Sequence, residues 1–308
     1  MADSAATDGI NVHKDQYYGD RGQGSDKSNR DRQVADIYVP VALGASSSSS
    51  ATRPELVVYV HGGSWRSGDK SEYTQLATRL IQLAGSRIAV AVINYTLSTK
   101  DKPDVIHPTH LVDCWLAVEW LAANGTRYGY DGEKLHLVGH SAGGHLTGLL
   151  ALSPPSETVA RVVRSVTGIS GIYDVPGLVA KWPTYVDFVE MAFGDDQEYW
   201  RLASPQCHPL NDQDLDSISD RNRMRLAVVM TEGKPIPPLT GIRYLVAHSL
   251  GDELVDPTGQ SASYHSHLIG AGFKQARLLC EDWGTHFGSL ASDGLLQAVA
   301  SHVLSDDS

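Results

Sequence analysis

One serine lies in a sequence context that suits nucleophilic catalysis. Ser141 is the centre of Gly139-His-Ser-Ala-Gly143, a G-x-S-x-G pattern that follows the apolar residues 135–138 and precedes an Ala- and Leu-rich stretch. A strand that turns sharply into a helix would present this serine at the tip of the turn, and glycines on both sides let the backbone pass close to its neighbours. The N-terminus of that helix favours negative charge. A serine that merely caps a helix is the alternative interpretation.

A glycine pair follows another apolar run. Residues 56–60 lead directly into His61-Gly62-Gly63-Ser64-Trp65. The tetrahedral intermediate of acyl transfer requires N–H groups that converge on its oxyanion, and glycines let the backbone turn such groups inward. We therefore expect the N–H groups of Gly62, Gly63 and Ala142 to form an oxyanion hole, with an ordinary strand-ending turn as the alternative.

A carboxylate and a histidine follow the serine in the order Ser, Asp, His that α/β-hydrolases use. Asp252 is the first carboxylate after the apolar residues 242–247, and we rank Glu253 and Asp256 behind it. His286 follows the last apolar run and can reach Ser141 over the carboxyl edge of a sheet. The sequence therefore predicts a catalytic triad of Ser141, Asp252 and His286, while capping of the next helix is the alternative role for Asp252.

The remaining histidines fit other roles. His140 and His145 flank the serine on the wrong sides of the turn to act as its base, so we expect them to pack or orient other groups. His265 and His267 are two residues apart in a predicted helix, a spacing that does not place them on one face. We expect neither a metal site nor a cofactor.

Alternating apolar strands and amphipathic helices must position these residues. The expected strands are 34–39, 56–60, 88–93, 135–138, 166–169, 242–247 and 276–280, and the expected helices are 71–84, 111–123, 258–271 and 290–304. Repeated strand–helix units favour an α/β fold with a mostly parallel central sheet flanked by helices. We expect a polar arm over residues 1–33 and one hydrolase domain over 34–308, with small cap or lid insertions at 175–200 and 211–240.

The two motifs together carry a resemblance to a known family. The run HGG-x-W after a buried strand, with GHSAGGH downstream, resembles the kynurenine formamidase (arylformamidase) group of α/β-hydrolases. Isoprenylcysteine methylesterases and HGG-type esterases share much of this pattern. The resemblance extends from about residue 36 to His286, and it implies the α/β-hydrolase fold with Gly62 and Gly63 in the oxyanion motif. Ser64 replaces the third glycine of hormone-sensitive-lipase-like esterases, which favours the formamidase side.

The resemblance implies a serine hydrolase that cleaves a small amide or ester through an acyl-enzyme, with N-formylkynurenine as the expected substrate. A carboxylesterase or methylesterase that acts on a hydrophobic ester, in a biosynthetic pathway, is the alternative. A non-catalytic binding protein of the same fold is a third hypothesis, which a complete triad argues against. The candidate substrate-binding side chains are aromatic: Trp65, Tyr95, Trp182 and Tyr185.

Composition limits the partners. The net charge of −11 disfavours binding to the phosphates of nucleic acid, and the three cysteines show no CxxC spacing typical of zinc sites. The sequence has no apolar stretch near the length of a membrane span and no secretory signal pattern. We expect a cytoplasmic enzyme with a small-molecule substrate, present as a monomer or homodimer.

Overall fold

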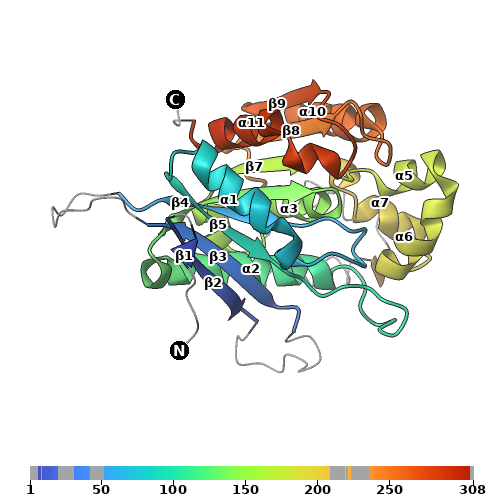
Figure 1. Ribbon diagram of the computed structural model, residues 1–308. Coiled ribbons are helices and arrows are strands. Elements are labelled where there is room, and N and C mark those ends of the chain that lie inside the picture. The colour runs from blue at the N-terminus through green and yellow to red at the C-terminus, as the bar shows by residue number, and fades with distance from the viewer. Residues whose placement is uncertain are drawn as a thin grey trace.

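A computed structural model describes residues 6–7, 9–19, 31–41, 52–208, 219, 221–222 and 236–305. Within these residues nine strands form one sheet, in the order β1-β2-β3-β5-β4-β6-β7-β8-β9 (Figure 1). The strands are β1 (Ala6–Thr7), β2 (Ile10–Tyr17), β3 (Val34–Pro40), β4 (Glu55–Val60), β5 (Ile88–Ile93), β6 (Asp131–His140), β7 (Val163–Ile169), β8 (Arg243–Ser249) and β9 (Ala276–Glu281). The six strands from β4 to β9 run parallel to one another, and β1, β2 and β3 pair in antiparallel fashion.

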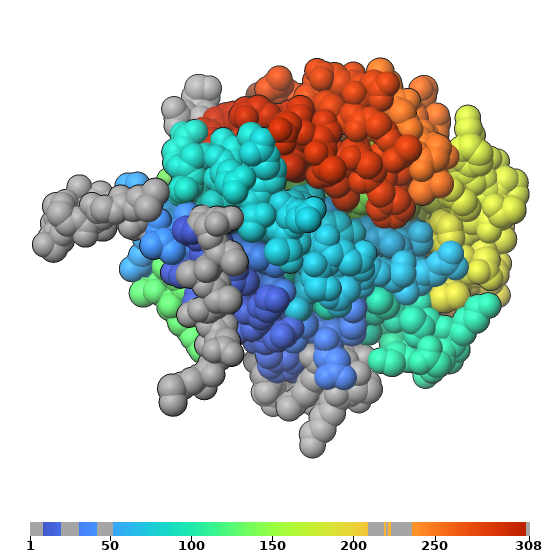
Figure 2. Space-filling view, in the orientation of Figure 1, coloured from blue at the N-terminus to red at the C-terminus, as the bar shows by residue number. Residues whose placement is uncertain are grey.

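Helices cover both faces of this sheet because its strands are apolar on both sides. In β4, Leu56 and Val58 contribute to one buried cluster, and Val57 and Tyr59 contribute to the other. The first cluster contains residues of α2 (Thr109–Tyr128), α3 (Ala142–Leu152) and α10 (Ser263–Gly270), and the second contains residues of α1 (Thr74–Leu83) and α11 (Asp293–Val303). Figure 2 shows α1 and α11 side by side on the second face. The expected mostly parallel sheet between helices is confirmed.

Short helices gather at one end of the sheet, beyond the carboxyl end of β7 (Figure 1). They are α5 (Val175–Lys181), η3 (Pro183–Tyr185), α6 (Val186–Phe193) and α7 (Gln197–Leu202). These helices occupy the expected cap segment 175–200. The other expected lid, 211–240, lies outside the described residues except for 219, 221–222 and 236–240.

The remaining short helices connect larger elements. They are η2 (Lys70–Tyr73), α4 (Glu157–Val162), η4 (Pro205–Cys207), η5 (Pro257–Ala262) and η6 (Gly288–Ala291). The predicted helix at 71–84 is therefore η2 followed by α1, and the one at 258–271 is η5 followed by α10. No helix in the described part of the chain is long and apolar enough to cross a membrane.

The expectation of a polar arm over residues 1–33 is wrong for residues 10–17. This stretch is strand β2, which pairs with β3 across the register Ile10↔Pro40 to Tyr17↔Val34. Ile10 and Val12 are buried while the polar residues between and after them are more exposed. A strand near the edge of a sheet needs only this alternation, so its polar side chains concealed it in the sequence.

Candidate active site

Ser141 occupies a strained turn between β6 and α3. Its backbone angles are φ 54° and ψ −118°, a region that a non-glycine residue adopts at a cost of about 1–3 kcal/mol. The neighbouring strand helps to hold this conformation, because the Ser141 N–H donates to the carbonyl of Ile169 at 2.9 Å. The residue is 5% exposed. The predicted strand–turn–helix setting of the serine is thus present.

The glycines on both sides of Ser141 are required by close backbone contacts. A Cβ atom on Gly139 would meet the carbonyl oxygen of Gly143, and a Cβ on Gly143 would meet the carbonyl oxygen of Val60. The first turn of α3 therefore lies directly against the end of β4. The first N–H groups of a helix have no partner within the helix, so the N–H of Ala142 is suited to donate a hydrogen bond to an anion.

The loop after β4 brings Gly62 against the serine. A Cβ atom on Gly62 would lie 2.9 Å from the Cβ of Ser141 and 3.0 Å from Nδ1 of His140. Gly63 has φ +109°, and its carbonyl accepts the N–H groups of Arg66 and Ser67, both at 3.0 Å. The glycine pair therefore forms a tight turn whose first member leaves no room for a side chain beside Ser141.

Buried aromatic side chains support residues 61–65, which form the predicted oxyanion loop. The Tyr95 hydroxyl donates to the carbonyl of His61 at 3.1 Å, and the two rings stack with centroids 4.5 Å apart. Burial lowers the pKa of His61 to about 4, so its ring is neutral and donates from Nδ1 to the carbonyl of Gly62 at 2.7 Å. Tyr95 is fully buried, so the prediction that it contacts substrate is wrong.

Trp65 is also fully buried, which contradicts its predicted place in the substrate pocket. Its indole N–H donates to Nδ1 of His145 at 3.3 Å, and its ring packs edge-on against Phe193 with centroids 4.8 Å apart. His145 in turn donates from Nε2 to the carbonyl of Ala203 at 2.8 Å. Trp65 therefore anchors the oxyanion loop in the core, and His145 orients it as expected.

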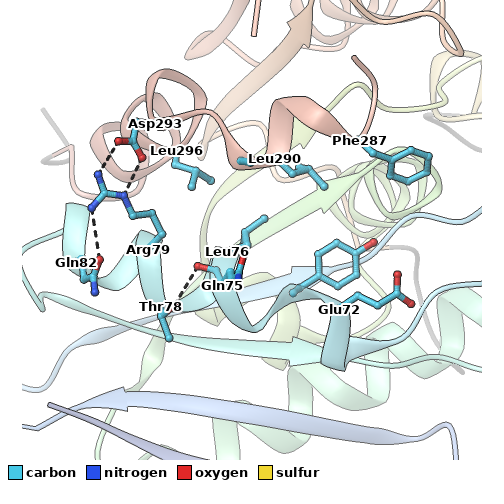
Figure 3. A pocket seen from close by; sticks show the side chains of 12 residues that line it. Glu72, Gln75, Leu76, Thr78, Arg79, Gln82, Phe287, Leu290, Asp293 and Leu296 are labelled. Atoms are coloured by element: carbon cyan, nitrogen blue, oxygen red, sulfur yellow. Dashed lines mark hydrogen bonds and ion pairs between the residues drawn. The ribbon is translucent and has the colours of Figure 1, made fainter. Parts of the chain in front are cut away.

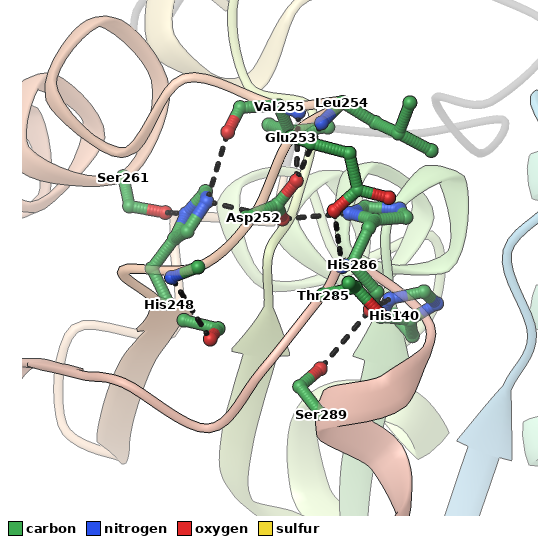
Figure 4. Close-up of polar contacts among 12 residues, drawn as sticks. His140, His248, Asp252, Glu253, Leu254, Val255, Ser261, Thr285, His286 and Ser289 are labelled. Atoms are coloured by element: carbon green, nitrogen blue, oxygen red, sulfur yellow. Dashed lines mark hydrogen bonds and ion pairs between the residues drawn. The ribbon is translucent and has the colours of Figure 1, made fainter.

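Asp252 lies after β8 and is enclosed by hydrogen-bond donors (Figure 4). Its Oδ2 accepts from Nδ1 of His286 at 2.6 Å, and Nε2 of His248 is 3.3 Å from the same oxygen. Its Oδ1 accepts the N–H groups of Leu254 and Val255, both at 2.9 Å. Burial alone would raise the pKa of Asp252, but the bonds from His248, His286 and the backbone hold it well below its usual range. The side chain is therefore an ionised carboxylate.

Three contacts fix His286 besides its bond to Asp252. Its N–H donates to Glu253 Oε2 at 3.0 Å, and its carbonyl accepts from Nε2 of His140 at 3.1 Å and from the Ser289 hydroxyl at 3.0 Å. The rings of His140 and His286 lie 4.5 Å apart. Burial, then the adjacent His286, hold the pKa of His140 well below its usual range. Since His140 precedes Ser141 in the chain, the imidazole of His286 lies beside the strained turn.

The two other predicted substrate-binding residues lie on the cap segment. Tyr185 and Trp182 are both partly buried, with ring centroids 6.2 Å apart. The Tyr185 hydroxyl donates to the carbonyl of Leu254 at 3.4 Å, in the loop that carries Asp252. The cap segment thus reaches the acid loop, and both side chains keep exposed surface there.

A groove of about 580 Å³ lies between η2 and α1 on one side and η6 and α11 on the other (Figure 3). Its lining is mixed, because apolar side chains such as Leu76 and Leu290 alternate with polar ones such as Arg79 and Asp293. Phe287 lines the groove at one end, is 54% exposed, and packs edge-on against His286 at 5.0 Å. Phe287 therefore provides exposed apolar surface next to His286.

Sequence reasoning missed His248, and it gave Glu253 no role besides that of a second candidate acid. His248 stands at the end of a predicted strand, four residues before Asp252, and only its closeness to the predicted acid could have indicated a contact. In the described part of the chain, no group of three or more His, Cys, Asp or Glu side chains could hold a metal ion. A hydroxyl, an imidazole paired with a carboxylate, and backbone N–H groups are the components of nucleophilic acyl transfer.

Comparison with known proteins supports this chemistry. The family model described as BD-FAE matches residues 36–222. A kynurenine formamidase of Meyerozyma guilliermondii is 36% identical over 152 residues, which cover 47% of this chain and 54% of that protein. The chain thus aligns with about half the length of this relative. The kynurenine formamidase-like hydrolase fscH of Fusarium equiseti is 28% identical over 271 residues, which cover 80% of each chain.

Solved structures show the fold. Carboxyl esterase 2 of the fungus Tuber melanosporum superposes with a TM-score of 0.63 at 21% identity, over 88% of this chain and 81% of that one. This likeness and the mostly parallel sheet flanked by helices show that the chain has the α/β-hydrolase fold.

Proposed function

The chain belongs to the BD-FAE family of α/β-hydrolases, and from this premise we propose that it is a serine hydrolase that works through an acyl-enzyme. The observation that carries the proposal is the 2.6 Å bond between Asp252 and Nδ1 of His286, on a ring that lies beside the turn of Ser141. The proposed roles are nucleophile for Ser141, general base for His286 and orienting acid for Asp252.

The first half of the reaction acylates the serine. Because Nδ1 of His286 donates to Asp252, Nε2 is free to accept the hydroxyl proton of Ser141. The serine oxygen then attacks the carbonyl carbon, and the N–H groups of Gly62, Gly63 and Ala142 stabilise the oxyanion. The protonated His286 gives its proton to the leaving nitrogen or oxygen, and the bond to that atom breaks.

The second half releases the acyl group. Water gives a proton to Nε2 of His286 and attacks the acyl carbon. The same N–H groups stabilise the oxyanion of this second tetrahedral intermediate. Collapse of the intermediate returns the proton to Ser141 and frees the acid. Asp252 stays ionised throughout, since four donors surround its oxygens.

The proposed substrate is an N-formylated aromatic amine, with N-formylkynurenine as the first to test. The names of the relatives from Meyerozyma and Fusarium support this choice. A formyl group is the smallest acyl group, and it suits a nucleophile that is only 5% exposed and touched by Gly62. Tyr185 and Trp182 are candidates to contact the aromatic part of the substrate.

A carboxylesterase that acts on a hydrophobic ester is the second candidate. The exposed ring of Phe287 against His286 favours it, because an apolar leaving group would find surface there. For either substrate we propose a cytoplasmic enzyme, as a monomer or homodimer. Its three free cysteines support a reducing compartment.

The test combines a covalent probe with a substrate comparison. A fluorophosphonate should label the wild-type protein and leave Ser141→Ala unlabelled, and an unlabelled wild type would contradict the serine hydrolase. Rates of formate release from N-formylkynurenine and of cleavage of p-nitrophenyl esters then separate the two candidates. Ester cleavage without formamide turnover would exclude the formamidase and favour the esterase.

A further inference from the structure

A second histidine contacts the carboxylate of Asp252 from the side opposite His286 (Figure 4). His248, in β8, is fully buried. Its Nε2 lies 3.1 Å from the carbonyl oxygen of Val255 and 3.3 Å from Oδ2 of Asp252. Its Nδ1 lies 2.6 Å from the hydroxyl oxygen of Ser261, which is also fully buried.

These contacts determine where the proton of the imidazole lies. A carbonyl oxygen and an ionised carboxylate only accept hydrogen bonds, so Nε2 of His248 carries the hydrogen. In a neutral ring Nδ1 is then an acceptor, and the Ser261 hydroxyl donates to it. The Ser261 hydroxyl therefore supplies the hydrogen that Nδ1 lacks in the neutral tautomer in which His248 donates from Nε2.

The N–H of His248 lies between two acceptors, the carbonyl of Val255 at 3.1 Å and Oδ2 of Asp252 at 3.3 Å. Oδ1 of Asp252 is held by the N–H groups of Leu254 and Val255, while Oδ2 receives His286 at 2.6 Å and His248 at 3.3 Å. Val255 also accepts from His248, so the same ring ties the side chain of Asp252 to the backbone that binds its other oxygen.

We propose that His248, oriented by Ser261, is a positioning residue of the triad. It holds Oδ2 of Asp252 in line with Nδ1 of His286 and thereby keeps His286 in the tautomer that accepts the serine proton. This inference rests on the proposed function, because it assigns His248 to the same reaction.

The chain contains a matched control at the other end of the sheet. His136 in β6 is buried and makes the same kind of contacts, from Nδ1 to the Ser165 hydroxyl at 2.8 Å and from Nε2 to Glu55 at 2.8 Å. Glu55 begins β4, whereas the oxyanion loop follows the end of that strand. Loss of Ser165 should therefore disturb a Ser–His–carboxylate set with a buried serine and histidine, without touching the triad.

The experiment compares Ser261→Ala with Ser165→Ala and adds two changes of His248. Outer-shell partners of metal ligands contribute about 10- to 100-fold to affinity or activity. His248 and Ser261 hold a corresponding outer position behind Asp252, so we expect Ser261→Ala to lower kcat about tenfold and His248→Leu to lower it about 100-fold. KM should stay within about twofold, since neither group meets the substrate in this assignment. His248→Gln, whose amide N–H can replace Nε2–H, should recover most of the loss, and Ser165→Ala should leave kcat unchanged.

A spectroscopic readout separates positioning from stability. The Nδ1 proton of His286 should give a far-downfield proton NMR resonance in the wild type, and His248→Leu should weaken or abolish it. Wild-type kcat in folded Ser261→Ala and His248→Leu, with that resonance intact, would overturn the inference. An equal loss of kcat in Ser165→Ala would also overturn it. Failure of the wild type to react with a fluorophosphonate would instead overturn the proposed function.

Discussion

Asp252→Asn is the change that tests the assigned acid most directly. The carboxylate is surrounded by four donors, two backbone N–H groups on Oδ1 and two histidine nitrogens near Oδ2. An amide at this position must direct its NH₂ group at one of these pairs. The backbone N–H groups cannot become acceptors, so the NH₂ group is driven to the side of His286 and His248. His286 can then avoid a clash of two donors only by losing the proton on Nδ1.

The size of the effect follows from that change of tautomer. With Nδ1 bare, the proton of neutral His286 lies on Nε2, which can no longer accept the proton of Ser141. The same change of an acid to its amide in a serine protease triad lowers kcat by about 10⁴-fold, which corresponds to about 5 kcal/mol of activation free energy. We expect a loss of this order in kcat, with a much smaller change in KM.

The assay is steady-state hydrolysis of the best substrate, with Glu253→Gln as the matched control. Glu253 is exposed and binds the backbone N–H of His286 at 3.0 Å, whereas Asp252 binds its ring. We expect Glu253→Gln to keep kcat within about tenfold, because the amide oxygen of glutamine can still accept the N–H of His286 and only the negative charge is lost. A kcat for Asp252→Asn within tenfold of wild type would refute the reasoning. So would an equal loss in Glu253→Gln, which would give the acid role to Glu253.

Three further changes probe the groups around the triad. Gly62→Ala would place a Cβ 2.9 Å from that of Ser141, so the loop must shift. We expect kcat to fall about 10²–10³-fold, as it does on loss of an oxyanion donor. The control Gly270→Ala should leave kcat unchanged, because a Cβ there would meet nothing within 4 Å. Tyr95→Phe removes the donor to the carbonyl of His61. The free energy of unfolding, measured in urea, should fall by about 1–3 kcal/mol, and kcat should fall as well. Unchanged values of both would contradict the role of Tyr95 in supporting the oxyanion loop. Burial lowers the pKa of five histidines to about 4 or about 3, so they are neutral in the fold but bind protons on unfolding below pH 6.5. Each contributes stability that is present above pH 6.5 and is lost as the pH falls, by about 1.4 kcal/mol per histidine between pH 7.5 and 5.5. Equal urea midpoints at these two pH values would contradict this; the residues are His61, His110, His145, His208 and His302.

The sequence predicted the components of the site that depend on local backbone geometry. Gly139 and Gly143 stand on both sides of Ser141 because a Cβ at either position would collide with backbone atoms, and this requirement is visible as a short motif. The order of the parallel strands was readable because each of them contains a short apolar run, such as Leu56–Val60 in β4 and Ile88–Ile93 in β5. The position of Asp252 followed from its place after such a run, although its contact with His286 spans 34 residues.

The sequence did not show which way the side chains beside the motif point. Trp65 follows the oxyanion glycines directly, which suggested a place in the pocket. Ser64 and Trp65 both have positive φ angles, 53° and 58°, and this conformation accompanies an indole that lies in the core against His145 and Phe193. The position of Trp65 next to the glycines in the sequence does not show that its side chain turns into the core. The sequence also did not show that β2 pairs with β3. Only the pairing reveals which side chains of β2 face the core and which face solvent.

The cap and the oxyanion loop are joined more firmly by apolar packing than by charge. Arg66 reaches Asp187 of α6 at 3.4 Å, but both side chains are largely exposed, and such a pair contributes about 0–1 kcal/mol. Phe193 of the same helix packs on the fully buried ring of Trp65, and burial of one such aromatic side chain contributes about 1.5–3 kcal/mol. Movement of α6 would therefore displace Trp65 and, through the backbone, Gly62 and Gly63. Substitutions in the cap that change substrate specificity should therefore alter kcat as well as KM, because the cap and the proposed oxyanion donors share one core.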